Sequence, residues 1–216
     1  MPASPDLSSL QRFGFLTLSG YSMIAVSNAI EALRMANRLA GEEIYIWSVL
    51  SLDGDAVLSS NGLSLAPTQS VKTVSRPDVV FVCGGVDVRT ATGPGLLTWL
   101  RQQARQGVAL GALCTGTFAL AEAGLLRGYR SAIHWENLSS IREEFPEIDI
   151  TDDLFVIDRN RLTCTGGLAP LDMMLKIIAS RYGMARVNEI STQFLLDRDR
   201  SGDERQPLPV PPGTPE

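Results

Sequence analysis

Long hydrophobic runs are missing from this sequence of 216 residues. No apolar stretch approaches the roughly 18 residues that a helix needs to cross a bilayer. The first residues, Met-Pro-Ala-Ser-Pro-Asp, have neither a basic start nor an apolar segment, so we expect no secretory signal. These absences argue against a membrane-spanning protein and favour a cytoplasmic protein without a membrane partner.

Cysteine is also scarce. Cys83, Cys114 and Cys164 are odd in number, widely spaced and outside any C-x-x-C pattern. This spacing argues against a disulfide framework and a structural zinc site, and it indicates a reducing compartment. We therefore expect no metal site and no cofactor.

Positive charge is in short supply as well. Lysine and arginine together number 19 against 24 aspartates and glutamates, and the formal net charge is -5. The cationic residues form no basic stripe, so we do not expect this chain to hold DNA by itself. The length and the hydrophobic content of 44% favour one soluble α/β domain over two small ones.

The most informative stretch surrounds Cys114. Residues 108–113 form an apolar run of strand length, and the Ala-rich stretch that follows is typical of a helix ending at Gly124. Cys114 stands on the turn between them, which predicts a nucleophile elbow with cysteine in place of serine. A buried structural cysteine is the alternative. At an elbow, the helix amino-terminus is expected to lower the thiol pKa from about 8.5 into the range of roughly 3.5 to 7.5.

Strand and helix patterns alternate along the rest of the chain. The first helix is expected to begin at Ser22 as its N-cap and to end at Gly41. The apolar run 79–83 is typical of a central parallel strand. This alternation predicts an α/β fold, a largely parallel sheet with helices on both faces. Further elements are expected as strands at 13–18, 44–52 and 131–135, a hairpin at 148–157 and 162–165, helices at 96–106 and 136–145, a helix opened by 165–167, and a last helix carrying Val187, Ile190, Phe194 and Leu195.

Three small or reactive turns fall at the carboxyl ends of predicted strands, where such sheets bind ligands. They are Gly84-Gly85, Cys114 and Gly166-Gly167. The free N–H groups of Gly84-Gly85 are candidates for binding an oxyanion or a carboxylate, and a plain tight turn is the alternative.

His134 is the only histidine in the chain, so a cysteine–histidine dyad must pair Cys114 with His134. In such a dyad the imidazole takes the thiol proton and an adjacent carboxylate orients the ring. A surface or core histidine without a catalytic role is the alternative. Tyr21 and Trp135 lie at predicted strand-to-helix ends, where each is either a pocket aromatic for a cationic ligand or a core residue.

Four motifs together resemble a known family: Cys83-Gly-Gly85, the stretch Cys114-Thr-Gly-Thr-Phe-Ala-Leu-Ala-Glu-Ala-Gly-Leu-Leu-x-Gly128, the pair His134-Trp135, and Thr165-Gly-Gly-x-Ala-x-x-Asp172. They resemble the amino-terminal domain of AraC-type transcription regulators, which is similar to class I glutamine amidotransferases and PfpI-like intracellular proteases. The resemblance runs from about residue 13 to residue 205.

The resemblance implies a flavodoxin-like fold and a cytoplasmic, dimer-forming sensor domain. In the family, two helix-turn-helix units follow and bind promoter DNA, so DNA would be a partner only through a domain that this chain lacks. Carried over by position, Cys114 is the elbow cysteine, His134 is the histidine near it, and the N–H groups of Gly85 and Thr115 are oxyanion-type donors. Residues 22–37 most resemble regulators of carnitine, choline, betaine and arginine breakdown.

One departure from the family bears on catalysis. In the protease and deglycase relatives, a glutamate at the start of the first helix bonds the cysteine, and Ala25 stands at the matching position. The resemblance thus implies a binding site with a vestigial dyad of Cys114 and His134, not an enzyme. A cysteine-dependent hydrolase or deglycase is the rival, and a structural dimerisation module with an empty pocket is a third possibility. The predicted ligand-binding residues are Tyr21, Gly84, Gly85, Cys114, Thr115, His134 and Trp135.

The composition changes after residue 196. The following stretch is charge-dense, and five of the final ten residues are proline. This composition is typical of a linker. We expect a sensing domain at 1–196 and, at 197–216, a linker toward a DNA-binding domain, with a disordered tail as the alternative.

Overall fold

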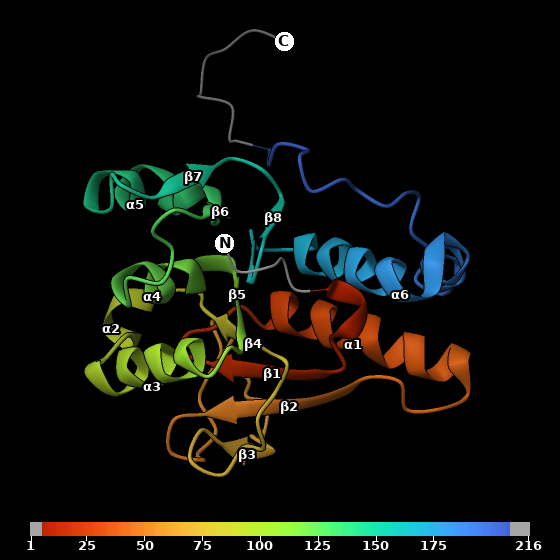
Figure 1. Cartoon of the computed structure of the whole chain (residues 1–216), viewed down its shortest axis with the longest axis horizontal. Helices are drawn as coiled ribbons and strands as arrows, with labels where there is room; N and C mark the ends of the chain where they lie inside the picture. Colours follow the sequence, from red (N-terminus) through yellow and green to blue (C-terminus); the bar gives the residue numbers. More distant parts are fainter. Residues whose placement is uncertain (1–5, 208–216) are drawn as a thin grey trace, which may run out of the picture.

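The computed structural model describes residues 6–207, and its centre is a seven-stranded sheet (Figure 1). The strand order is β3-β2-β1-β4-β5-β9-β8, and every neighbouring pair is parallel except β8 and β9. This confirms the flavodoxin-like α/β fold. The strands are β1 (Arg12–Thr17), β2 (Ile46–Ser51), β3 (Gln69–Ser70), β4 (Val79–Cys83), β5 (Ala109–Leu113), β6 (Arg130–Ala132), β7 (Asp149–Thr151), β8 (Phe155–Asp158) and β9 (Arg161–Cys164).

The predicted hairpin is confirmed only in its second half. Strands β8 and β9 pair around the turn as expected. The stretch 148–157 is not one strand, however, because β7 leaves the main sheet and pairs with β6 in a separate two-stranded sheet. Asp153, between β7 and β8, is buried and forms an ion pair of 2.8 Å with Arg130 of β6.

Helices cover both faces of the sheet, as predicted. Helices α1 and α6 pack together on one face, and α3, α4 and α5 contribute to the core on the other (Figure 1). Helix α1 ends at Gly41, whose φ of 72° is left-handed. Ser22 occupies the N-cap position of α1 without a side-chain capping bond. The helices are α1 (Met23–Ala40), α2 (Val88–Ala91), α3 (Pro94–Arg105), α4 (Thr117–Glu122), α5 (Leu138–Glu144) and α6 (Ala169–Gln193).

Helix α6 corresponds to the two last predicted helices. Its backbone breaks at Gly183, with φ 75° and ψ 174°, so each half follows its own axis. Val187 and Ile190 are buried in the second half, but Phe194 and Leu195 lie beyond the helix end, and Leu195 is 88% exposed. The sequence analysis missed β3 and α2, which have two and four residues, because elements this short show no periodicity.

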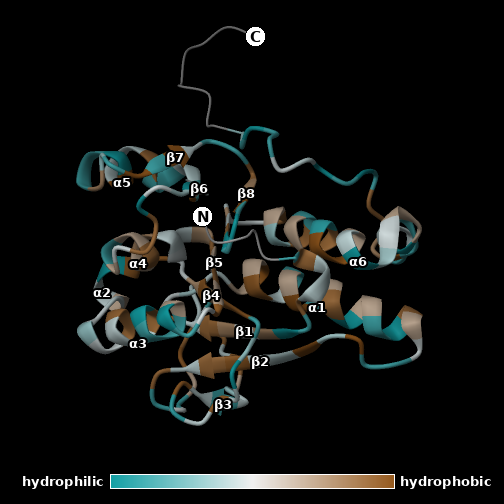
Figure 2. Cartoon of the chain, viewed as in Figure 1, coloured by the Kyte–Doolittle hydropathy of each residue, from teal (hydrophilic) through white to brown (hydrophobic). Residues whose placement is uncertain are grey.

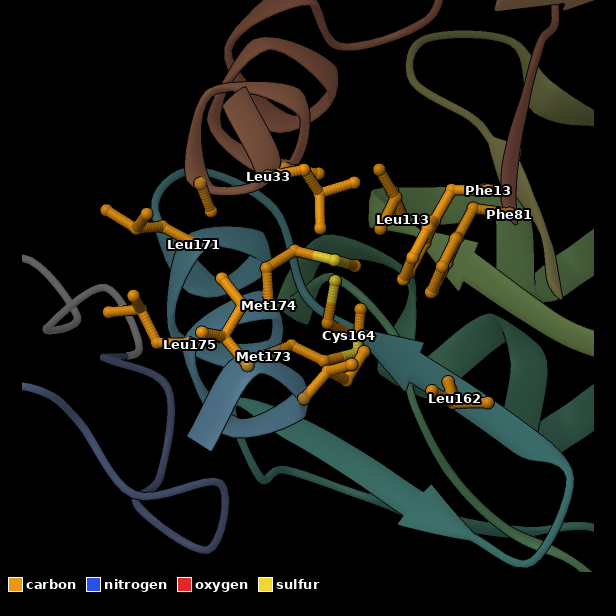
Figure 3. Packing of buried hydrophobic residues seen from close by; sticks show 14 of the residues in the cluster. Phe13, Leu33, Phe81, Leu113, Leu162, Cys164, Leu171, Met173, Met174 and Leu175 are labelled. Carbon is orange, nitrogen blue, oxygen red and sulfur yellow. The ribbon is translucent and has the colours of Figure 1, made fainter. Parts of the chain in front are cut away.

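The core is fully apolar along the central strands. All residues of β4 and β5 are buried, and Figure 2 shows the central strands in brown. Phe13, Phe15 and Phe81 stack on the face that α1 and α6 cover, with the rings of Phe15 and Phe81 5.7 Å apart. On the same face Cys164 lies among Leu113, Met173 and Met174 (Figure 3). The rigid sheet below the elbow is therefore close-packed.

Residues 197–207 lie against the domain. Leu154 donates its N–H to the carbonyl of Glu204 over 2.8 Å, and Gln206 donates its N–H to Asp152 over 2.9 Å. The packed structure thus continues to residue 207, past the expected boundary at 196. The rest of the expected linker, 208–216, lies outside the described residues.

Candidate functional site

Cys114 sits at a sharp strand-to-helix turn, as predicted. Strand β5 ends at Leu113, Cys114 begins one turn of 3-10 helix (Cys114–Gly116), and α4 follows directly. Cys114 has a φ of 59°, a left-handed conformation that is uncommon for a residue with a side chain and costs of order 1–3 kcal/mol. A Cβ at Gly116 would overlap the Val82 carbonyl, so glycine is required beside the cysteine. These features confirm the nucleophile elbow.

The predicted lowering of the thiol pKa is wrong. Cys114 is only 8% exposed, and this burial raises its pKa to about 11. A backbone hydrogen bond from Thr115 acts in the opposite direction, and the Glu136 carboxylate raises the pKa further. Desolvation of the thiolate outweighs the pull of a short helix, because α4 has six residues and starts three residues after the cysteine. At neutral pH the site therefore holds a neutral thiol.

His134 faces the same space as Cys114. A Cβ at Gly166 would lie 3.2 Å from Cys114 Sγ and 3.6 Å from His134 Nε2, so Gly166 forms a floor beneath both side chains. Yet the hydrogen bonds found across residues 6–207 include none between Cys114 and His134. The predicted dyad is thus a pair of neighbours without a proton-transfer contact.

A carboxylate lies beside the imidazole. Glu136 Oε2 is 3.6 Å from His134 Nδ1, which is buried and has no hydrogen-bond partner within the described chain. Burial lowers the pKa of His134, and Glu136 partly offsets this. The imidazole is therefore neutral at pH 7. Glu136, two residues after His134, therefore lies where the carboxylate that orients the ring was expected.

These residues line a cavity of about 520 Å³. It opens at the carboxyl ends of β4 and β5, where α/β sheets bind ligands. Gly85, Cys114, Thr115 and His134 from the predicted set are brought together in it. The lining is Ser22, Ser60, Gly85, Val86, Asp87, Val88, Arg89, Thr90, Cys114, Thr115, His134, Glu136 and Asn137.

Three of the predicted residues lie outside that lining. Tyr21 is fully buried, and its hydroxyl accepts the Leu65 N–H over 2.9 Å, so it belongs to the core. Gly84 has both backbone groups engaged, since its N–H donates to Leu113 and its carbonyl accepts from Ser22. Trp135 packs partly buried against the core beside the His134 ring, with centroids 5.5 Å apart. Of the two roles predicted for Tyr21, pocket aromatic or core residue, the structure shows the core residue.

The cavity is acidic in balance. Arg89 pairs with Glu144 and lies over the Phe118 ring, 4.6 Å from its centroid, so its charge is already matched. Asp87 and Glu136 form no ion pair with lysine or arginine in the part of the chain that the structure describes. Asp87 and Arg89 escaped the sequence analysis because they flank or belong to α2. Glu136 could have been predicted from the sequence, because it lies two residues after the single histidine.

Comparison with known proteins fits this geometry. Residues 15–180 match the DJ-1/PfpI family. The chain belongs to the DJ-1/PfpI family. It is similar to the crystal structure of an AraC family transcriptional regulator from Pseudomonas putida, with a TM-score of 0.77, 33% identity, and coverage of 85% of this chain and 99% of that one. The resemblance to AraC-type regulators is therefore confirmed.

Two curated relatives of the chain are transcriptional regulators. The chain is 44% identical over 206 residues to the HTH-type transcriptional regulator GbdR of Pseudomonas aeruginosa, covering 95% of this chain and 56% of that protein. It is 42% identical over 200 residues to the HTH-type transcriptional regulator CdhR of Pseudomonas aeruginosa, covering 93% and 59%. The chain thus spans just over half the length of these relatives.

Two further observations complete the description. No helix within residues 6–207 combines the length and the apolar character that a membrane crossing requires. Over the same residues, no three His, Cys, Asp or Glu side chains gather closely enough to hold a metal ion.

Proposed function

We propose that this chain is the effector-sensing and dimerisation domain of an AraC-type transcription regulator, and that its effector is a small nitrogenous metabolite of the carnitine, choline, betaine or arginine type. The observation that supports this proposal most is the polar cavity at an elbow with a protonated cysteine, in a chain 44% identical to an HTH-type regulator. Promoter DNA is contacted through a separate domain.

The site is better suited to binding than to turnover. Cysteine chemistry needs a thiolate, and burial of Cys114 disfavours it. The first turn of α1 carries no acidic residue, and Ala25 is fully buried in the core. No carboxylate from this helix can therefore activate the thiol, which supports a role without turnover.

The charge of the cavity favours a ligand with a cationic nitrogen. Asp87 and Glu136 supply two negative charges, and Arg89 is already paired with Glu144. In the same cavity, the N–H of Gly85 makes no backbone bond within the described chain, so it is free to meet a ligand carboxylate. Gly85, Cys114, Thr115 and His134 are then contacts to the effector, with Glu136 beside its nitrogen.

Binding would act through the dimer. A ligand that contacts one dimer geometry better than another shifts the population toward it. The DNA-binding units that follow the sensor would move with that shift. Regulation therefore requires differential contacts, not ligand affinity alone.

The first experiment is a thermal unfolding series on this chain with saturating carnitine, choline, glycine betaine, dimethylglycine and arginine. A ligand at ~100 times its Kd stabilises the folded state by about 2.7 kcal/mol and raises Tm by several degrees. Glu136→Gln is the matched variant, and it should weaken the shift. Full-length protein whose promoter affinity ignores every such metabolite would contradict the sensor proposal.

An enzyme assay separates the rival function. Methylglyoxal and a small amide are the test substrates for a cysteine-dependent deglycase or hydrolase. We expect no turnover above background. Turnover that disappears in Cys114→Ser would contradict the proposal and establish an enzyme.

A further inference from the structure

The charged segment at 197–207, here called the C-terminal strap, runs back across the domain after α6. Figure 1 shows it in dark blue, from the end of α6 over the upper side of the molecule. It adds backbone hydrogen bonds next to the edge strand β8: Phe155 donates its N–H to Gly202, and Asp153 and Arg205 form an antiparallel bridge. A Cβ at Gly202 would overlap the Phe155 ring and carbonyl, so the strap sits close against the strand.

Two side chains anchor the C-terminal strap in the interior. Gln206 is 5% exposed and donates from Nε2 to the Ile133 carbonyl over 3.1 Å. Arg200 binds the buried carboxylate of Asp172 through both its Nε and a terminal nitrogen, at 3.0 and 2.6 Å. Buried pairs of this kind hold one geometry, because breaking them leaves polar groups unsatisfied.

Two backbone routes lead from the strap toward the cavity, one from the Gln206 anchor and one from the Glu204 carbonyl. Ile133 directly precedes His134, a cavity residue. On the other side, the Thr165 N–H donates to Leu154 and the Leu154 N–H donates to Glu204, at 2.9 and 2.8 Å. Thr165 directly precedes Gly166, the floor beneath Cys114 and His134. Two short covalent and hydrogen-bonded connections therefore join the strap to His134, which lines the cavity, and to Gly166, which lies against Cys114 and His134.

We propose that the C-terminal strap is the element that couples occupancy of the Cys114–His134 cavity to the chain that continues beyond residue 207. A group that displaces His134 or presses on Gly166 moves the Ile133 and Leu154 backbones, and with them the strap. Coupling of this kind is reciprocal in binding free energy, so loosening the strap must also change the cavity. The regulatory meaning of this coupling rests on the proposed sensing function. The structural coupling between cavity and strap does not depend on that function.

Cys114 supplies a probe that needs no effector. Cys83 and Cys164 are fully buried, so iodoacetamide reports on Cys114 alone. We would measure the alkylation rate of the full chain at one pH in wild type, in Gln206→Leu and in Arg205→Leu. Gln206→Leu removes the bond to Ile133, together with the buried Oε1 that has no partner within the described chain, and leaves an apolar side chain of roughly similar volume in its place. Arg205→Leu is the matched control. The Arg205 side chain is 81% exposed, and its ion pair with Asp152 is long, at 3.7 Å.

The expected result is a rate about threefold to tenfold faster in Gln206→Leu, which is the size expected from losing one buried hydrogen bond, and a rate within about twofold of wild type in Arg205→Leu. Circular dichroism checks that both variants are folded. Equal rates in the two variants would overturn the coupling.

The effect of the cavity on the strap can be tested with wild-type protein, so this experiment does not depend on a variant that folds. Carboxymethylation of Cys114 places a charged group in the cavity, and hydrogen exchange then follows the Leu154 and Gln206 amides. We expect their exchange to change severalfold, while Thr68 and Val71 beside the distant strand β3 stay constant. Unchanged exchange at Leu154 and Gln206 would contradict the proposed coupling between the cavity and the C-terminal strap.

The two proposals fail separately. If no metabolite shifts Tm but the strap responds to Cys114, the sensor proposal falls and the coupling stands. If a metabolite shifts Tm but Gln206→Leu changes nothing, the sensor stands and the coupling falls.

Discussion

Two glycine pairs follow the two strands that flank β5, and they do different work. Gly84-Gly85 ends β4 and Gly166-Gly167 ends β9. A Cβ at Gly84 or Gly85 would overlap backbone atoms of Gly116 or Gly20. The atoms nearest to a Cβ at Gly166 belong to the side chains of His134 and Cys114, and a Cβ at Gly167 would meet nothing within 4 Å.

The difference separates a turn packed against backbone from a turn packed against side chains of the site. Backbone cannot move aside without disturbing the strands it belongs to, so Gly84-Gly85 holds the elbow in place even though Gly85 also lines the cavity. Side chains can rotate, so Gly166 sets the room available to Cys114 and His134 instead. Substitutions can test this difference between the two turns.

Gly85→Ala is expected to have the largest effect. The added methyl group overlaps the Gly20 carbonyl, so the β1 and β4 turns must separate, and the free energy of unfolding should fall by about 3 kcal/mol or more. Urea unfolding measures this loss. Gly93→Ala is the control, because Gly93 has a φ of -119° and nothing within 4 Å, and it should change stability by less than about 0.5 kcal/mol. Equal losses at both positions would contradict the steric argument.

Arg200→Ala tests whether the ion pair between Arg200 and Asp172 stabilises α6, the helix that follows Gly166-Gly167. Its loss leaves the Asp172 carboxylate, which is 5% exposed, without its cation. Because Arg200 is itself 29% exposed, water compensates in part, and we expect a loss of about 2 kcal/mol. Arg198→Ala breaks an exposed pair with Glu204 and should cost much less than Arg200→Ala. Equal losses in the two variants would contradict the argument that the burial of Asp172 makes its ion pair the more important one.

Gly166→Ala is expected to affect the site more than the fold. The free energy of unfolding should fall by only about 1 kcal/mol, since His134 can turn away. The alkylation rate of Cys114 and any effector-induced shift of Tm should change much more, because the methyl group presses against the side chains of Cys114 and His134. A variant as unstable as Gly85→Ala with an unaltered site would reverse the difference between the two turns.

The smallest expected effect is the pH dependence that comes from His134. Burial lowers its pKa in the folded state, so the unfolded chain binds more protons. Stability from this residue is therefore present above pH ~6.5 and is lost as the pH falls through the lower folded pKa. The difference in unfolding free energy between pH 8 and pH 5 should be smaller in His134→Gln than in wild type. A larger difference in the variant would place a favourable charge on His134 in the folded state.

Local patterns were enough to predict much of the fold. The apolar run 79–83, the left-handed turn at Gly41 and the strand–Cys114–helix elbow depend on neighbours in the chain, so their periodicity and small residues reveal them. Cys114 and Gly85 were predicted as site residues because the carboxyl ends of parallel strands converge, and His134 because it is the only histidine that could pair with the cysteine. Asp87 and Arg89 were not, since a four-residue helix has no detectable period.

Only the tertiary structure decided three matters. Tyr21 could be core or pocket because both environments accept an aromatic, and burial alone made it core. The Cys114 pKa depends on desolvation by distant elements, which outweighs the local helix end. The charged stretch after residue 196 has the composition of a linker, but its described part is packed by bonds such as Arg200 to Asp172, 28 residues apart, and Gln206 to Ile133, 73 residues apart. By itself the sequence determined the sheet, the elbow and the types of residue at the site, because these follow from local periodicity; the thiol pKa and the path of the strap follow from contacts that exist only once the chain has folded.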